Sequence, residues 1–385
     1  MKIELNQNDF EKVSKIERIS VMNSEVLELY ADYLANRSCF ITQELMEDII
    51  NSCHVSEEYA YLVLFAAACG LNMENSKRDL QITEVYLKPS IKKLEVKSYQ
   101  ENAYYKNVKI PEIQIGNWEL KYEKYQPYEA FIYNDLVVDQ DFREIPLLGF
   151  FSEEFLFPAV LESGTEWMTI TPNEIETMQP VVDVVTGKVI TFGLGLGYFA
   201  YMASEKEDVQ SVTIVEMNKK VIRLFKKYIL PQFPHKKKIE IIAMDAFEFA
   251  ENHMSDMNYN YAFVDLWHDA SDGVGLYLKM KKLECRCPDT KYYYWIEDTI
   301  LSGFRFLVLP VLLDGIEADH KNDSSQGAEE VGESNDPKES GEEEFERRYR
   351  AISSYMSEID ISTFRDFIYY LSNAFLRKLA VEIMG

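Results

Sequence analysis

The stretch Gly187–Met217 constrains the fold of this chain more than any other. It reads GKVITFGLGLGYFAYMASEKEDVQSVTIVEM: an apolar run, three glycines at alternate positions, a helical run, a second apolar run and an acid at its end. This order is typical of a parallel α/β nucleotide-binding fold, in which a tight turn after the first strand brings the backbone close to a ligand. Gly193, Gly195 and Gly197 suit that turn because glycine tolerates positive φ and carries no Cβ.

Later apolar runs extend this pattern into a series. Strands are predicted over residues 189–192, 211–215, 239–243, 261–264 and 292–296. The first four are followed by Gly193, Glu216, Asp245 and Asp265. Because the carboxyl ends of parallel strands form the ligand crevice of an open sheet, these residues are expected to converge in space. Short, wholly apolar strands also indicate that helices cover both faces of the sheet.

The predicted fold class is α/β: a Rossmann-like, mostly parallel sheet with flanking helices, plus an N-terminal helical and small β-containing region. Alternating residues predict a strand over 118–123, with 130–138 as its partner, and a helix is expected over 90–106. The predicted parts are a mainly helical domain 1–115, a β-containing cap 116–180, a Rossmann-like domain 181–316, an acidic disordered loop 317–343 and C-terminal helices 344–385.

Two segments near the C-terminus have weaker patterns. Residues 299–313 fit either a helix or a strand, and Pro310 argues against an unbroken form of both. After the acidic loop, apolar positions predict one amphipathic helix over 345–359 and a second, capped by Ser362, over 364–379.

Charge excludes one class of partner. The 385 residues carry 65 acidic and 40 basic side chains, a net charge of −25. Surfaces that bind nucleic acid need clustered Lys and Arg, so no nucleic-acid partner is expected. The basic run Lys219–Lys238 is a local exception. It is interpreted as the solvated face of a helix, with phosphate or RNA binding as the alternative.

The cysteines and the apolar runs indicate the cellular compartment of the protein. The five cysteines are Cys39, Cys53, Cys69, Cys285 and Cys287. Their spacing matches neither a disulfide framework nor a zinc site, so no metal is expected. The N-terminus lacks the pattern of a secretory signal, and the longest apolar run, Tyr59–Cys69, is about half a membrane span. These features predict a cytoplasmic protein without a membrane segment; a homodimer is compatible with them.

The spacing of the glycines reduces the number of nucleotide classes that the chain could bind. A GxGxxG dinucleotide turn needs glycine or alanine where this chain has Tyr198, and no Gly-Lys-Ser/Thr of a P-loop follows. Glu216 is placed to accept hydrogen bonds from both ribose hydroxyls, and Asp245-Ala246 suits the exocyclic amine of adenine. With the loop Gly193-Leu194-Gly195-Leu196-Gly197, this pattern resembles the class I S-adenosylmethionine-dependent methyltransferases.

A closer resemblance is to the spermidine-synthase-like branch of that superfamily. It rests on the segments Val215-Glu216-Met217-Asn218-Lys219-Lys220-Val221-Ile222 and Val264-Asp265-Leu266-Trp267-His268-Asp269. The similarity covers about Trp167 to Ile296. Spermidine synthases usually carry an aspartate inside the glycine loop, where this chain has Leu196.

The resemblance implies S-adenosyl-L-methionine as the cofactor. The expected cofactor-binding residues are Gly193, Leu194, Gly195, Gly197, Glu216, Met217, Asp245, Ala246, Asp265 and Thr171. The expected catalytic residues are Asp265, His268 and Asp269. A carboxylate at Asp265 would orient an amine acceptor and His268 would remove its proton, although a histidine beside Trp267 also fits simple packing. Trp167, Thr171 and Glu174 precede the first strand, in the element expected to lie over the cofactor edge, so they are candidates for ligand contact. The alternative is that Trp167 and Met168 belong to the core and that Thr171-Pro172 only starts a helix.

Three functions are compatible with this pattern. The leading hypothesis is a methyltransferase that acts on a small-molecule or peptide acceptor enclosed by the N-terminal part. The second is an aminopropyltransferase that uses the decarboxylated cofactor, since an acidic pocket would suit polyamines. The third is a non-catalytic cofactor-binding or scaffold protein that keeps the fold without turnover.

Overall fold

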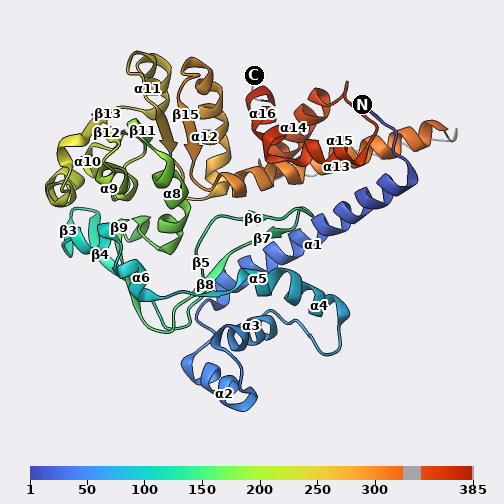
Figure 1. Cartoon of the computed structure of the whole chain (residues 1–385), viewed down its shortest axis with the longest axis horizontal. Helices are drawn as coiled ribbons and strands as arrows, with labels where there is room; N and C mark the ends of the chain where they lie inside the picture. Colours follow the sequence, from blue (N-terminus) through green and yellow to red (C-terminus); the bar gives the residue numbers. More distant parts are fainter. Residues whose placement is uncertain (324–339, 384–385) are drawn as a thin grey trace. The chain divides into compact units, whose positions relative to one another are not determined.

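The computed structural model describes residues 1–323 and 340–383 (Figure 1). The chain forms two compact units, each discontinuous in sequence. The larger unit comprises Asn23–Asp139 and Arg143–Glu297, and the smaller comprises Met1–Met22, Gln140–Phe142 and Asp298–Gly385. Most of the predicted acidic loop, residues 324–339, lies outside the described residues. The five-part division of the chain stays a prediction.

A five-stranded parallel sheet is the centre of the larger unit. Its strands are β11 (Gly187–Phe192), β12 (Val209–Glu216), β13 (Ile239–Ala243), β14 (Tyr261–Val264) and β15 (Lys291–Tyr294). They lie in the order β13-β12-β11-β14-β15, and every neighbouring pair is parallel. This Rossmann-like α/β sheet confirms the predicted fold class, and each of the five predicted strands is present.

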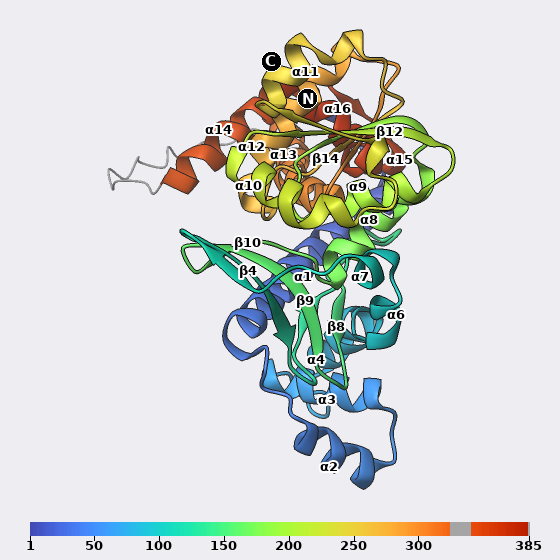
Figure 2. The same cartoon turned by 90° about the vertical axis from the view of Figure 1, so that its left-hand side faces the viewer.

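Helices cover both faces of the sheet. One face carries α8 (Pro172–Val184), α9 (Tyr198–Glu205) and α10 (Lys219–Leu224), and the other carries α11 (Ala246–Asn252) and α12 (Ala270–Leu283) (Figures 1 and 2). Phe263 of β14 stacks on Phe199 of α9 with ring centroids 4.4 Å apart. On the other face, the ring of Phe192 of β11 lies edge-on to the ring of Phe249 of α11, with centroids 6.4 Å apart. Apolar side chains on both sides of each strand therefore have a helix to pack against.

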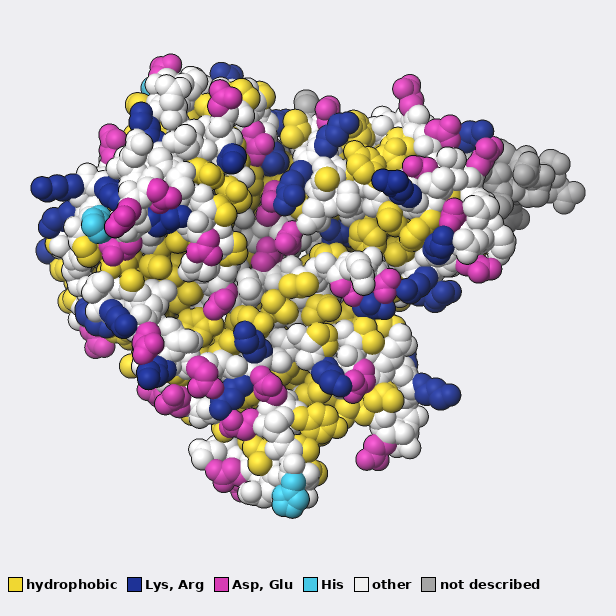
Figure 3. All heavy atoms as spheres, in the orientation of Figure 1, with side chains coloured by type: hydrophobic (Ala, Val, Ile, Leu, Met, Phe, Trp, Pro, Cys, Tyr) yellow, Lys and Arg dark blue, Asp and Glu magenta, His cyan; other side chains and the backbone are white. Residues whose placement is uncertain are grey.

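Short helical turns join these elements. They are η2 (Phe225–Ile229), η3 (Leu230–Gln232), η4 (Lys236–Lys238), η5 (Met254–Asp256) and η6 (Glu284–Arg286). Basic side chains from α10 to η4 gather at the left-hand edge of Figure 3. Lys219, Lys220, Arg223, Lys226 and Lys227 are all exposed. This exposure agrees with a solvated helix face.

A four-stranded antiparallel sheet forms the β-containing region. Its strands are β3 (Ile113–Ile115), β4 (Trp118–Tyr125), β9 (Phe155–Glu162) and β10 (Thr165–Thr169), in the order β10-β9-β4-β3. The predicted strand over 118–123 is confirmed, but its predicted partner, 130–138, is wrong. β4 pairs with β9 along its whole length. Pro158 lies inside β9, and a proline within an apolar run argues against a strand in the sequence alone.

The segment 130–138 belongs to smaller sheets. β5 (Phe131–Ile132) and β2 (Lys92–Lys93) flank β8 (Leu148–Phe150), and β6 (Val137–Val138) pairs with β7 (Glu144–Ile145). Each of these strands is only two or three residues long. Pairs this short carry little of the period-two pattern by which strands are predicted.

The remaining elements of the larger unit are helical. They are α1 (Gln7–Arg37), which continues from the smaller unit, α2 (Gln43–Cys53), α3 (Glu57–Ala68), α4 (Lys77–Ile82), the π-helical turn η1 (Thr83–Leu87), α5 (Lys88–Ser90), α6 (Val96–Gln100) and α7 (Ala103–Asn107). The single helix predicted over 90–106 is wrong. The side chain of Asn102 accepts the Tyr104 N–H at 2.9 Å, so α7 begins anew after α6.

The smaller unit joins the two ends of the chain. β1 (Lys2–Ile3) pairs in parallel with β16 (Asp360–Ile361) beside α13 (Glu297–Asp323), α14 (Ser340–Tyr355), α15 (Phe364–Leu371) and α16 (Asn373–Ile383). The second predicted C-terminal helix is divided, because Ser372 is extended between α15 and α16. Thr363, rather than Ser362, caps α15 in a reciprocal capping box with Asp366.

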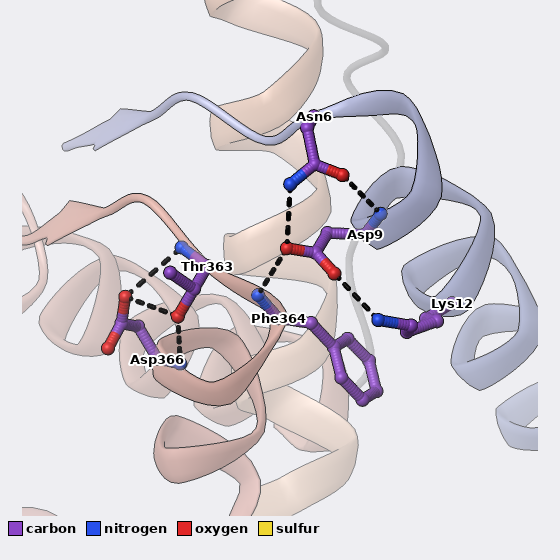
Figure 4. Close-up of polar contacts among 6 residues, drawn as sticks. All are labelled: Asn6, Asp9, Lys12, Thr363, Phe364 and Asp366. Carbon is purple, nitrogen blue, oxygen red and sulfur yellow. Dashed lines mark hydrogen bonds and ion pairs between the residues drawn. The ribbon is translucent and has the colours of Figure 1, made fainter.

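Asp9 fastens the first turn of α1 to the first turn of α15 (Figure 4). Its Oδ2 accepts the Phe364 N–H at 3.3 Å and the Asn6 amide at 3.0 Å. Its Oδ1 accepts the Lys12 ammonium at 2.8 Å. The bond from Lys12, together with these others, lowers the pKa of Asp9 below its ordinary value. The carboxylate thus acts as a cap supplied by a residue distant in sequence.

Helix α13 resolves the ambiguity around Pro310, since the helix continues through that proline. Its segment Glu297–Ile316 is long and apolar enough, by length and composition, to cross a membrane, and 67% of that segment is buried in the fold. The core helix of a globular protein has the same properties. Length and composition therefore do not decide between the two environments for α13.

Arg305 of α13 is buried and donates to the Leu371 carbonyl at 2.9 Å and to Asn373 Oδ1 at 2.6 Å. We predict that Arg305→Met destabilises the protein by about 1.5–3 kcal/mol, because carbonyl and amide groups at the α15–α16 break lose a charged donor. Urea unfolding measures the difference. Arg18→Met, an exposed change on α1, is the control and should cost under about 0.5 kcal/mol; equal losses would contradict the assignment.

Candidate functional site

A cavity of about 510 Å³ opens at the carboxyl ends of β11, β12 and β14. Its volume is in the range of small-molecule sites. It is lined by Glu166, Trp167, Met168, Thr169, Glu174, Gly193, Leu194, Gly195, Glu216, Met217, Asn218, Asp265, Leu266, Trp267, His268 and Trp295. Four of these described residues are acids and none is lysine or arginine. The cavity therefore favours a ligand with positive charge or hydrogen-bond donors.

The glycine turn forms one wall. Gly193 has φ +103°, and a Cβ at this position would lie 1.9 Å from the backbone oxygen of Asp265. A Cβ on Gly195, with φ +50°, would approach the end of the Met168 side chain at 2.9 Å. The Gly193 N–H donates to the Val215 carbonyl at 3.0 Å. The turn thus holds its backbone against the end of β14, where a side chain would not fit.

Glu216 stands beside this turn at the end of β12. Its Oε2 accepts the Leu194 N–H at 3.3 Å, and its Oε1 accepts the Asn218 N–H at 2.6 Å. Burial raises the pKa of Glu216, and these backbone donors oppose the rise. A carboxylate can accept about four hydrogen bonds, more than these backbone donors use, so the group can still accept from a ligand.

Asp265 follows β14 and is half-buried at the cavity. Its N–H donates to the Phe192 carbonyl at 2.9 Å, which continues the β11–β14 ladder by one residue. Burial raises the pKa of Asp265 to about 7, with His268 opposing the rise and Glu216 adding to it. The group therefore changes charge near neutral pH, a property expected of an acid or base at a functional site.

Glu174 faces the cavity from the first turn of α8. Glu174 is 8% exposed, and its Oε2 has no hydrogen-bond partner among the described residues. Burial raises the pKa of Glu174 well above its ordinary value, and the Asp265 and Glu166 carboxylates add to the rise. A buried carboxyl oxygen without a partner is costly unless a ligand satisfies it.

His268 is exposed at the rim, and its Nδ1 lies 3.0 Å from Asp272 Oδ2. With Nδ1 donating to that carboxylate, Nε2 is the atom that accepts a proton. Asp269 does not line the cavity. It caps α12 by accepting the Ser271 N–H at 2.7 Å, and Asp272 completes a capping box. The predicted catalytic role of Asp269 stays a prediction, while its geometry is that of a helix cap.

Three tryptophans surround the cavity. Trp267 is buried, and its Nε1 has no hydrogen-bond partner among the described residues. Trp295 donates from Nε1 to Thr177 Oγ1 at 3.0 Å. The ring of Trp167 lies edge-on to that of Trp118, with centroids 5.4 Å apart. Their rings supply apolar surface that suits a planar or cationic ligand.

The structure brings most of the sequence-predicted residues to this cavity. Those that line it are Gly193, Leu194, Gly195, Glu216, Met217, Asp265 and His268. Those that do not are Gly197, Asp245, Ala246, Thr171 and Asp269. Asp245 caps α11 by accepting the Phe247 and Glu248 N–H groups, each at 2.9 Å. Gly197, with φ +77°, begins α9 against Phe225.

Other lining residues are absent from the predicted site. Glu174 and Trp167 are candidates for ligand contact in the sequence, through their place before the first strand, and both line the cavity. Trp295 directly follows β15, so the rule that strand ends meet at one edge would have indicated it. Glu166 and Met168 belong to β10, which the sequence pattern does not place relative to the parallel sheet.

No protein-family model and no curated protein sequence matches the chain. Part of it is similar to two solved structures. The spermidine synthase from Thermotoga maritima matches at 14% identity and TM-score 0.28, over 39% of this chain and 54% of that one. A candidate caffeoyl-CoA O-methyltransferase from Staphylococcus aureus matches at 18% and 0.26, over 38% and 74%. The chain spans about half of the spermidine synthase. These likenesses concern the fold alone.

The contact between Gly193 and Asp265 gives a direct test of the turn. We predict that Gly193→Ala destabilises the protein by about 1–3 kcal/mol, because the added Cβ strains a positive φ and meets the Asp265 carbonyl. Gly275→Ala is the control. Gly275 is exposed on α12, and a Cβ added there would have no atom within 4 Å, so this change should be neutral or stabilise by up to about 1 kcal/mol. Urea unfolding distinguishes the two, and equal effects would refute the strain.

Proposed function

We propose that this protein is an S-adenosylmethionine-dependent methyltransferase that acts on a small-molecule or peptide acceptor. The observation that carries the proposal is the meeting of three strand ends at one cavity. Gly193, Glu216 and Asp265 all line it, although they are distant in sequence. This is the edge of an open parallel sheet at which such folds bind ligands.

The residues present fit the proposed cofactor. The glycine turn offers backbone that a ligand can approach closely, and Glu216 offers carboxylate oxygens to a pair of ribose hydroxyls. The cofactor would supply a methyl group on a sulfonium centre. A sulfonium is a cation, and the acidic, tryptophan-lined cavity suits a cation electrostatically.

Asp265, Glu174 and His268 suggest how an acceptor is handled. Asp265 and Glu174 would hold an amine and orient its nitrogen toward the reacting carbon. Nε2 of His268, oriented by Asp272, would take the proton that the acceptor loses. Water exclusion would come from the surrounding tryptophans. These roles favour an amine over an anionic acceptor.

One observation favours aminopropyl transfer as a second candidate. A cofactor that keeps its methionine carboxylate needs a partner for that anion, and the described lining residues include no lysine or arginine. The decarboxylated cofactor lacks this anion and carries a more positive charge. Its primary ammonium, no longer beside a carboxylate, would suit the unpartnered Oε2 of Glu174.

Titration calorimetry with S-adenosylmethionine, its decarboxylated form and NAD separates these functions. Preference for the first ligand supports methyl transfer, and preference for the second supports aminopropyl transfer. Binding of NAD alone would exclude both. Methyl transfer is then measured from labelled cofactor to an extract of small molecules and peptides.

Glu216→Ala should weaken binding of the preferred cofactor by about 1–3 kcal/mol, the range for hydrogen bonds to a charged group. Calorimetry gives the affinity. Glu240→Ala, an exposed change on the neighbouring strand β13, is the matched control and should leave the affinity unchanged. Unchanged affinity in Glu216→Ala would remove this residue from the site.

Binding of a diamine such as putrescine should strengthen as pH rises through about 7. Below that pH Asp265 is protonated and neutral, and above it the carboxylate attracts the ammonium. Calorimetry from pH 6 to 8 measures the change. Asp265→Asn should bind more weakly and lose the rise. A rise that persists in this variant would assign the titration to another group.

A further inference from the structure

We propose that Tyr104 and Tyr105, consecutive residues of α7, are positioning residues that set the spacing of two walls of the cavity, the glycine turn and the segment from β10 into α8. Neither tyrosine lines the cavity. The Tyr104 hydroxyl donates to the Leu196 carbonyl in the glycine turn at 2.7 Å. The Tyr105 hydroxyl donates to the Ile170 carbonyl, just before α8, at 2.6 Å. One short helix thereby holds both walls.

Tyr104 supports the glycine turn from behind. It is 1% exposed, and its ring contacts Tyr198 and Tyr201 of α9, with centroids 5.6 and 5.4 Å away. Within the turn, Gly197 N–H donates to the Leu194 carbonyl at 2.8 Å. The Tyr104 hydroxyl adds a hydrogen bond to the carbonyl of Leu196, which lies between these two residues. Burial raises the pKa of its hydroxyl well above the ordinary value, so the group stays protonated and able to donate.

Tyr105 supports the other wall in the same way. Its ring stacks on Phe155 of β9 with centroids 5.7 Å apart. The Ile170 carbonyl that it binds lies one residue before Thr171, the cap position of α8. Glu174 then projects from the first turn of that helix. A shift of Ile170 would therefore move the Glu174 carboxyl relative to the glycine turn.

Both ends of α7 are themselves anchored. Asn102 Nδ2 donates to the Tyr198 hydroxyl at 2.9 Å, and Asn107 Nδ2 donates to the Tyr201 hydroxyl at 2.7 Å. Gln232 of η3 exchanges hydrogen bonds with the backbone of Lys109 at 2.8 and 3.0 Å. A helix of one and a half turns fixed at both ends does not slide, so the two hydroxyls act from a rigid base.

Hydrogen exchange of the ligand-free protein tests the inference. The reporters are the Gly197 amide in the glycine turn and the Ile175 amide, which donates to the Thr171 carbonyl at the start of α8 at 3.2 Å. Tyr104→Phe should speed exchange of the Gly197 amide by about threefold to tenfold and leave the Ile175 amide unchanged. Tyr105→Phe should do the reverse. Both variants keep the rings and lose one hydroxyl. Tyr86→Phe is the control: Tyr86 is buried and its hydroxyl donates to Asn23 at 2.8 Å, away from the cavity.

A ligand experiment adds the functional consequence, and it alone rests on the proposed function. With 5′-methylthioadenosine as the probe, calorimetry should show affinity reduced about threefold to tenfold in Tyr104→Phe and unchanged in Tyr86→Phe. If the unaltered protein binds no nucleoside, the proposed function fails, while the exchange measurement still decides the positioning role.

Three outcomes overturn the inference. One is acceleration of both reporter amides equally in the two variants, which would mean general loosening of the fold. Another is no acceleration in either variant, which would mean that the hydroxyls do not hold the loops. The third is a Tyr86→Phe variant with the same exchange pattern as Tyr104→Phe, which would mean that loss of any buried tyrosine hydroxyl produces that pattern.

Discussion

Parallel pairing of the central strand with both neighbours determines where the candidate site lies. Phe192, the last residue of β11, is in register with Val215 of β12 and Val264 of β14. The next residue of each strand therefore reaches the same level: Gly193, Glu216 and Asp265. Hydrogen bonds continue across this level, from Gly193 to Val215 and from Asp265 to Phe192. A slip of one residue would turn each side chain to the opposite face and scatter the group.

The parallel sheet could be predicted from the sequence because its strands are short apolar runs, most of them followed by glycine or an acid. The antiparallel region could not. Pro158 obscures β9, and strands as short as β5 have too few residues to show a period. The helix predictions were wrong at the points where a helix is interrupted. Ser372 divides α15 from α16 through its backbone conformation, and no proline or glycine marks that position.

The site divides along similar lines. Residues at the ends of predicted strands could be found, but an aspartate after a strand has two uses that sequence does not separate. Asp265 faces the cavity, whereas the carboxylate of Asp245 accepts hydrogen bonds from the first turn of α11. Glu174 could not be found by the strand rule, since it enters from a helix. Burial raises its pKa, and that of Asp265, because the fold places both acids where water solvates them poorly. Such a cost is typical of a site arranged for a ligand.

Three of the four tryptophans of the chain line the cavity, and the fourth, Trp118, contacts one of them. Indole emission responds to the polarity and the charges around the ring. The tryptophan fluorescence of this protein therefore originates at the candidate site or one ring away from it. The chain carries its own optical reporter, so ligands can be sought by mixing and observing the emission, before any reaction is known.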